Sequence, residues 1–102
     1  MNLWDGDHRR LAAEFAEFDA ENPAVYQYFI RFSREVKSRG HARYSAYAVM
    51  HRIRWFVAIE TTAEDFKINN NWGPFYARKL MREYPAEFEG FFELRQMKHS
   101  AA

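Results

Sequence analysis

Apolar residues recur at helical spacing along most of the chain, and the first run of this pattern ends at an Asn-Pro pair. Leu11, Phe15 and Phe18 are separated by four and three residues, which places them on one face of a helix. Asp5 or Asp7 suits the start of that helix, because a short acidic side chain accepts hydrogen bonds from the first free amides. The pattern therefore predicts a first helix with a single buried stripe.

A second helix is predicted over residues 23–39. Asn22 favours the N-cap, and Pro23 fits the first helical position because its φ is already helical and it has no amide hydrogen to leave unpaired. Gly40 provides the stop. Phe29 lies in the middle of the apolar stripe, so we expect its ring to be in the core.

Two further helices are expected. Ser45 is a suitable N-cap for the third helix, and the fourth covers residues 74–84, between Gly73-Pro74 and Pro85. Both carry apolar residues at helical spacing, which predicts that each buries one face. The expected core positions are Val49, Ile53, Phe56 and Val57 in the third helix and Ala77, Leu80, Met81 and Tyr84 in the fourth.

The end of the chain leaves two interpretations open. Phe88, Phe91 and Phe92 predict an aromatic cluster that closes the core. Residues 92–95 alternate between apolar and polar, so they either pair with residues 66–68 as a two-stranded ribbon or continue as a frayed helix.

We expect one compact domain over residues 1–102, of the mainly α class, with four to five helices. A short β ribbon in a winged-helix-like variant is the alternative. Residues 96–102 are predicted to form a loose tail. No internal repeat or interdomain linker interrupts the pattern.

Composition narrows the class of protein. Ten Phe, six Tyr and three Trp are enough rings both to fill a core and to stack on a ligand. The 15 Lys and Arg against 14 Asp and Glu leave a formal charge of +1, so no overall field attracts the chain to DNA or to an anionic membrane. The chain has no cysteine, no segment of transmembrane length and no signal-peptide pattern. These features favour a cytoplasmic protein that does not bind membranes.

The common signatures of enzymes are missing from the sequence. The histidines at positions 8, 41, 51 and 99 form no i, i+4 pair of the kind that binds a metal. No serine lies in a nucleophile elbow, and there is neither a Walker loop nor a Gly-rich dinucleotide pattern. We therefore expect a non-enzymatic binding protein with no cofactor, no metal and no catalytic residue.

The richest mixture of amides, rings and cations lies in residues 66–78, at the expected start of the fourth helix. The third helix carries a second group, in which arginines adjoin Trp55. If both groups meet, the rings stack on a heteroaromatic base, the amides contact its edge, and the cations neutralise phosphates. The predicted ligand-binding residues are Arg52, Arg54, Trp55, Lys67, Asn69, Asn70, Asn71, Trp72, Tyr76 and Arg78.

The favoured ligand is therefore nucleotide-like, of the adenine, ADP-ribose or cyclic-nucleotide type. Two alternatives stay open. In one, the third and fourth helices form a helix-turn-helix variant that binds DNA, although their connector over residues 59–73 is far longer than the usual turn. In the other, the chain is a protein-interaction module. A homo-oligomer is also among the expected states, because small chains often complete a site across a symmetric interface.

Four short groups of residues form a recognisable combination in this sequence. They are Asn22-Pro23-Ala24-Val25-Tyr26, Arg52-Ile53-Arg54-Trp55, Asp65-Phe66-Lys67-Ile68-Asn69-Asn70-Asn71 and Tyr76-Ala77-Arg78. Together they resemble a family of small uncharacterised proteins from bacterial and phage genomes, with a similarity that covers residues 18–95. Where the family is expected to have Tyr and a variable residue, this chain has Trp72-Gly73. The phage association implies a role against host defence, as a sponge for immune nucleotide signals or as an inhibitor of a defence protein.

Overall fold

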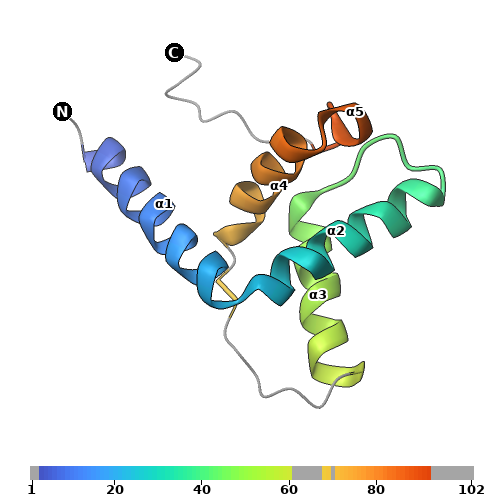
Figure 1. The fold of residues 1–102 in the computed structure, drawn as a ribbon, viewed down its shortest axis with the longest axis horizontal. Coiled ribbons are helices and arrows are strands. Elements are labelled where there is room, and N and C mark those ends of the chain that lie inside the picture. The colour runs from blue at the N-terminus through green and yellow to red at the C-terminus, as the bar shows by residue number, and fades with distance from the viewer. Residues whose placement is uncertain (1–2, 61–67, 70, 93–102) are drawn as a thin grey trace.

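A computed structural model of the 102-residue chain describes residues 3–60, 68–69 and 71–92, with side chains from residue 8 onwards. Figure 1 shows that α2, α3 and α4 cross one another while α1 extends to one side. The expected mainly α, compact fold is therefore confirmed. The helices in these residues are α1 (Leu3–Glu21), α2 (Pro23–Ser38), α3 (Ala46–Glu60), α4 (Trp72–Glu83) and α5 (Pro85–Phe88).

The first two helices meet at Asn22. Helix α1 already begins at Leu3, so the prediction that it starts at Asp5 or Asp7 is wrong. Asn22 does occupy the N-cap position of α2, with Pro23 as its first residue. Its side-chain amide, however, donates to the carbonyl of Phe18 at 3.0 Å, so it closes α1 and does not cap α2. This contact fixes the sharp change of direction between the two helices.

The connection from α2 to α3 follows the sequence prediction closely. Helix α2 ends at Ser38, and Gly40 adopts a φ of +98°, a conformation that side chains with a Cβ rarely adopt. The hydroxyl of Ser45 accepts hydrogen bonds from the amides of Tyr47 at 3.1 Å and Ala48 at 3.3 Å. Ser45 is therefore the cap of α3, as predicted.

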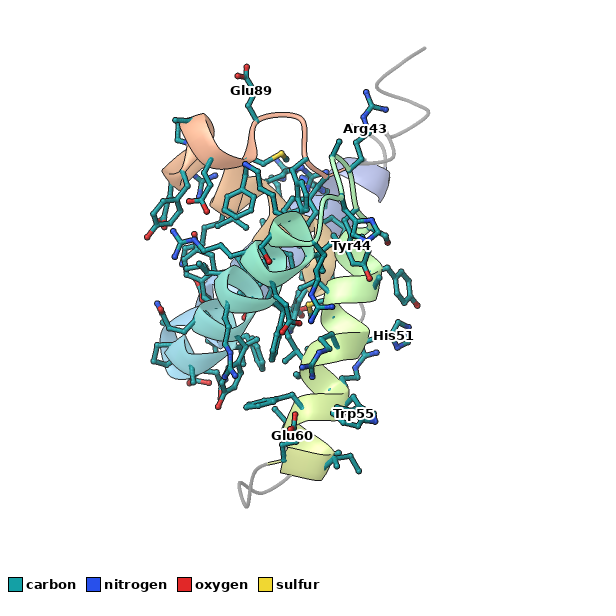
Figure 2. The ribbon with its side chains drawn as sticks, turned by 90° about the vertical axis from the view of Figure 1, so that its right-hand side faces the viewer. Arg43, Tyr44, His51, Trp55, Glu60 and Glu89 are labelled. Carbon is teal, nitrogen blue, oxygen red and sulfur yellow. The ribbon has the colours of Figure 1, made fainter. Side chains whose placement is uncertain are left out.

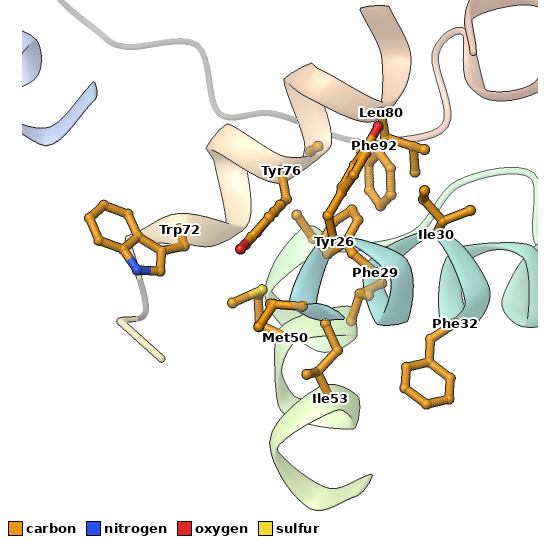
Figure 3. Packing of buried hydrophobic residues seen from close by; sticks show 14 of the residues in the cluster. Tyr26, Phe29, Ile30, Phe32, Met50, Ile53, Trp72, Tyr76, Leu80 and Phe92 are labelled. Atoms are coloured by element: carbon orange, nitrogen blue, oxygen red, sulfur yellow. The ribbon is translucent and has the colours of Figure 1, made fainter. Parts of the chain in front are cut away.

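The core lies where α2, α3 and α4 cross (Figure 3), and Phe29, Ile53 and Leu80 are fully buried there. Gly73 lets α4 approach α3 closely, because a Cβ at this position would lie only 3.3 Å from Cγ of Met50. The expected burial of Tyr84 is wrong, since Tyr84 is the C-cap of α4 and its ring is exposed. Of the other expected core positions, Val49, Val57 and Ala77 are buried, while Phe56 and Met81 are partly exposed.

The C-terminal part of the described chain closes the core as expected. Phe88, Phe91 and Phe92 are all buried. Phe92 forms a parallel bridge with Tyr44, whose amide donates to the carbonyl of Phe91 at 2.9 Å. Of the predicted ribbon partner, only Ile68 is described, and it is not in a strand. The predicted tail over residues 96–102 lies outside the described residues.

Ion pairs fasten the outer helices to the core. Arg34 on α2 binds Glu87 on α5 through two hydrogen bonds, Nε to Oε2 at 2.8 Å and Nη2 to Oε1 at 3.0 Å. This guanidinium lowers the pKa of the Glu87 carboxyl below its ordinary value of 4.5. On the other side of the molecule, Lys79 on α4 pairs with Asp19 on α1. Across the described ranges, every helix is too short or too polar to cross a membrane.

Candidate functional site

Two of the predicted ligand-binding rings lie in the interior. Trp72 is 5% exposed and packs against Phe15, with the ring centroids 5.7 Å apart. Tyr76 is 0% exposed, and its ring lies 4.7 Å from that of Phe15 and 5.5 Å from that of Phe29. Trp72, Tyr76 and Leu80 recur at four-residue intervals, which places all three on the inward face of α4 (Figure 3). Other side chains therefore cover the ring surfaces that a ligand would need.

The hydroxyl of Tyr76 is also closed off from solvent. It has no hydrogen-bond partner among the residues that the structure describes. Burial raises the pKa of Tyr76 above its ordinary value of 10.0, and the nearby carboxylate of Asp19 adds to this effect. The hydroxyl therefore stays protonated at neutral pH and lies away from any surface.

The Asn-rich segment builds a turn. The side-chain oxygen of Asn69 accepts a hydrogen bond from the amide of Asn71 at 2.8 Å, and the main-chain oxygen of Asn69 accepts one from the amide of Trp72 at 3.0 Å. Asn71 is at the N-cap position of α4 and makes no capping bond through its side chain to any described residue. Both side chains are exposed. The predicted residues Lys67 and Asn70 lie outside the described part of the chain.

The three predicted arginines lie in different environments. Arg54 donates from Nη2 to the carbonyl of Ile68 at 3.0 Å, which brings it beside Asn69. The guanidinium of Arg52 lies 5.4 Å from the Trp55 ring centroid. Arg78 lies over Phe75, at 5.9 Å from the ring centroid, and Phe75 in turn stacks on Phe15 of α1. Arg52 thus lies near Trp55, and Arg54 lies near Asn69. Arg78 is on the side of α4 that faces α1.

Arg52 is held by carboxylates as well as by rings. Its Nε lies 3.7 Å from Glu35 and its Nη1 lies 3.8 Å from Glu60. Its guanidinium carbon lies 4.3 Å above the centroid of Phe32, on the α2 side of α3. Two carboxylates therefore offset the charge of this arginine.

Trp55 belongs to a row of exposed side chains that the sequence pattern did not predict as a group. Tyr47, Trp55 and Ile59 are 52%, 53% and 64% exposed, and His51 between them is also exposed. They recur at four-residue intervals and so form one continuous ridge along α3. Figure 2 shows His51 and Trp55 projecting from the same side of the helix. We call these four residues the outer ridge.

Two neighbouring rings of the outer ridge stack on each other. The rings of Tyr47 and His51 stack with centroids 5.1 Å apart and an interplanar angle of 21°. Arg43 is exposed just before α3, beyond the N-terminal end of the ridge (Figure 2). The ridge is an open surface and not a cavity, so it is suited to binding and offers no enclosed site for a reaction.

Charge is distributed unevenly along the sequence. Residues 36–59 contain no Asp or Glu and five cations, so they carry a formal charge of +5 in a chain of net +1. The remaining residues therefore sum to −4. The five cations are Lys37, Arg39, Arg43, Arg52 and Arg54.

Two features of the sequence mark this surface. Tyr47 and Ile59 are large apolar residues that lie outside the core stripe of α3. Residues 36–59 also lack carboxylates, although residues 66–82 lack them too, so charge alone does not single out the third helix. The two features indicate the surface only in combination.

Among the described residues, no group of three or more His, Cys, Asp or Glu side chains is placed to hold a metal ion. No protein family model matches the chain, and neither does any curated protein or any solved structure. The case for a function therefore depends on the outer ridge and on the charges around it.

Proposed function

We propose that this chain is a non-enzymatic protein that binds nucleic acid on the outer ridge of α3. The bases stack on Tyr47, His51 and Trp55, and nearby arginines attract the phosphates. One observation carries the proposal: the exposed rings lie within residues 36–59, a stretch that has five cations and no carboxylate. Rings combined with a cationic surface are the usual means of binding nucleic acid without reading its sequence.

The rings supply the part of the affinity that requires bases. Stacking of a base on an aromatic side chain contributes about 1–3 kcal/mol per base by alanine substitution. Neighbouring ridge residues are one turn apart, which is about 6 Å along the helix axis. Successive bases of one strand can therefore contact successive rings.

The cations supply the part that requires phosphates. Arg39 and Arg43 are exposed in the segment that leads into α3, and Arg54 flanks the ridge. Arg54 also donates a hydrogen bond to the carbonyl of Ile68. Two or three phosphate contacts predict a slope of about −1.4 to −2.1 for the logarithm of affinity against the logarithm of salt concentration.

The test is fluorescence anisotropy with a labelled, unstructured oligonucleotide of about 16 nucleotides. Trp55→Ala should weaken binding by about 5-fold to 150-fold, the equivalent of 1–3 kcal/mol. Trp55→Phe should retain part of the affinity because it keeps a ring. The matched control is Tyr84→Ala, which removes an exposed ring from the end of α4 and should not change binding. No binding up to about 100 μM protein, the weak limit of non-specific affinity, would refute the proposal.

A second set of variants tests the charges. Arg43→Gln should weaken binding and reduce the salt slope by about 0.7, the loss of one phosphate contact. Arg82→Gln removes an exposed cation from the last turn of α4 and serves as the control. An equal loss for both variants would show that total charge, and not the ridge, controls binding.

The exposure of Ile59 favours a second candidate, a protein partner on the same ridge. Trp, Tyr and Arg dominate the energies of protein interfaces, and a large exposed aliphatic side chain is typical of such a surface. The two candidates differ in their response to salt, because the affinity of an apolar interface falls little as salt rises, whereas the affinity of phosphate contacts falls steeply.

The small nucleotide ligand predicted from the sequence is tested separately, by titrating the protein with adenosine monophosphate and with ADP-ribose.

A further inference from the structure

We infer that the outer ridge takes single-stranded rather than duplex nucleic acid, with unpaired bases against the rings. This inference rests on the proposed function, because it names the form of nucleic acid that the same surface would bind. Two features carry it: the kind of side chain on the ridge, and the position of the carboxylates beside it.

The ridge presents ring faces and a hydrocarbon. Its members are Tyr47, His51, Trp55 and Ile59, whereas base edges in a duplex are read chiefly by Arg, Lys, Asn and Gln. The faces of paired bases are covered by their neighbours in the stack, so a side chain reaches them only after the stack opens. An unpaired base has an open face, and it can stack on an exposed ring without that cost.

The arginines beside the ridge are engaged with the protein. Arg52 lies over Phe32 and between two carboxylates, and Arg54 donates to the carbonyl of Ile68 at 3.0 Å. Reading a guanine edge requires a guanidinium with two donors directed outward. Neither arginine therefore presents a guanidinium that is free to read a base edge.

The carboxylates oppose a duplex and leave room for a strand. A helix in the major groove lies between two walls of phosphates. Glu35 and Glu60 gather around Arg52 on the α2 side of α3, so one wall would meet two carboxylates against a single cation. A single strand has only one line of phosphates, and that line can follow the flank of the ridge that lies away from Glu35 and Glu60.

The inference is tested by competition for a labelled single strand bound to the 102-residue chain. The competitors are the same strand without label, its blunt duplex, the same sequence as single-stranded RNA, and an abasic strand of equal length. The unlabelled strand should compete at a concentration at least about tenfold lower than the duplex or the abasic strand, because only the strand offers open base faces. DNA and RNA strands should compete within about threefold of each other, because the rings contact bases and not the 2′-hydroxyl.

The possible outcomes distinguish failure of this inference from failure of the proposed function. A duplex or an abasic strand that competes as well as the single strand would overturn the inference and leave nucleic-acid binding intact. A preference of about tenfold for RNA or for DNA would contradict the expectation that the strand is held through its bases, because the sugar would then be a contacted group. Failure of every probe to bind would refute the proposed function itself. As a further check, Trp55→Ala should reduce competition by the single strand about tenfold and leave that by the duplex unchanged, whereas Tyr84→Ala should change neither.

Discussion

Two tryptophans that the sequence assigned to the same ligand provide the sharpest test of the structure. Trp72 is buried against Phe15 and Phe18, with ring centroids 5.7 and 5.9 Å away, whereas Trp55 is half exposed on the outer ridge. Replacing a buried Trp with Ala costs about 3–5 kcal/mol, because the transfer energy of the ring is lost and a cavity remains. A domain of this size has about 5–15 kcal/mol in total, so Trp72→Ala should remove a large part of its stability.

Trp55→Ala should cost less than about 1 kcal/mol. The ring is largely hydrated already, and its main described partner is the Arg52 guanidinium, at 5.4 Å from the ring centroid. Urea unfolding followed by far-UV circular dichroism measures both variants. With a slope of about 1–3 kcal/mol per molar urea, Trp72→Ala should lower the midpoint by at least about 1 M. Equal losses for the two variants, or a loss below about 1 kcal/mol for Trp72→Ala, would refute the assignment of one ring to the core and the other to the surface.

Three further predictions concern the core and the ion pair between Arg34 and Glu87 that holds α5 to α2. Tyr76→Phe should raise the free energy of unfolding by about 1 kcal/mol, because it removes a buried hydroxyl with no described partner; a lower melting temperature would contradict this. Phe29→Ala should cost about 3–5 kcal/mol in urea unfolding, and a cost below about 1 kcal/mol would contradict its burial. Glu87→Gln should be less stable than wild type at neutral pH, and the difference should vanish in acid. Arg34 lowers the pKa of this carboxyl in the folded state, so its contribution is present above 4.5, the ordinary value, and is lost as the pH falls through the lowered pKa. Glu89→Gln, which removes an exposed carboxylate nearby, should show no such pH dependence.

The pattern of apolar residues was sufficient to predict most of the fold, because helix starts and core stripes depend on neighbouring residues. Ser45 and Gly40 cap α3 and end α2 as their chemistry requires. The start of α1 was misjudged because the helix continues upstream of a residue that is a good cap in isolation. Phe92 pairs with Tyr44, which is distant from it in the sequence. The alternation of apolar and polar residues around Phe92 does not indicate which distant segment it pairs with.

The candidate site was harder to predict, since the same residue types fill cores and bind ligands. Trp72 and Tyr76 are four residues apart, a spacing typical of the buried face of a helix. They were assigned to the predicted pocket because amides and cations lie close to them in the sequence. Local charge would not have separated the two groups, because residues 66–82 also have four cations and no carboxylate, and they cover most of α4. Which rings point outward depends on how α3 packs between α2 and α4, and that is a property of the whole fold.

The most direct test of the central claim is a ¹H–¹⁵N NMR titration of the protein with a short single strand of DNA. The indole resonances of Trp55 and Trp72 report on the two surfaces at once, and Trp→Phe variants assign them. Binding on the outer ridge predicts that the Trp55 indole and the amides around Tyr47 and His51 shift, while the Trp72 indole does not. A shift of the Trp72 indole with Trp55 unchanged, or no shift at any of these positions, would contradict the account.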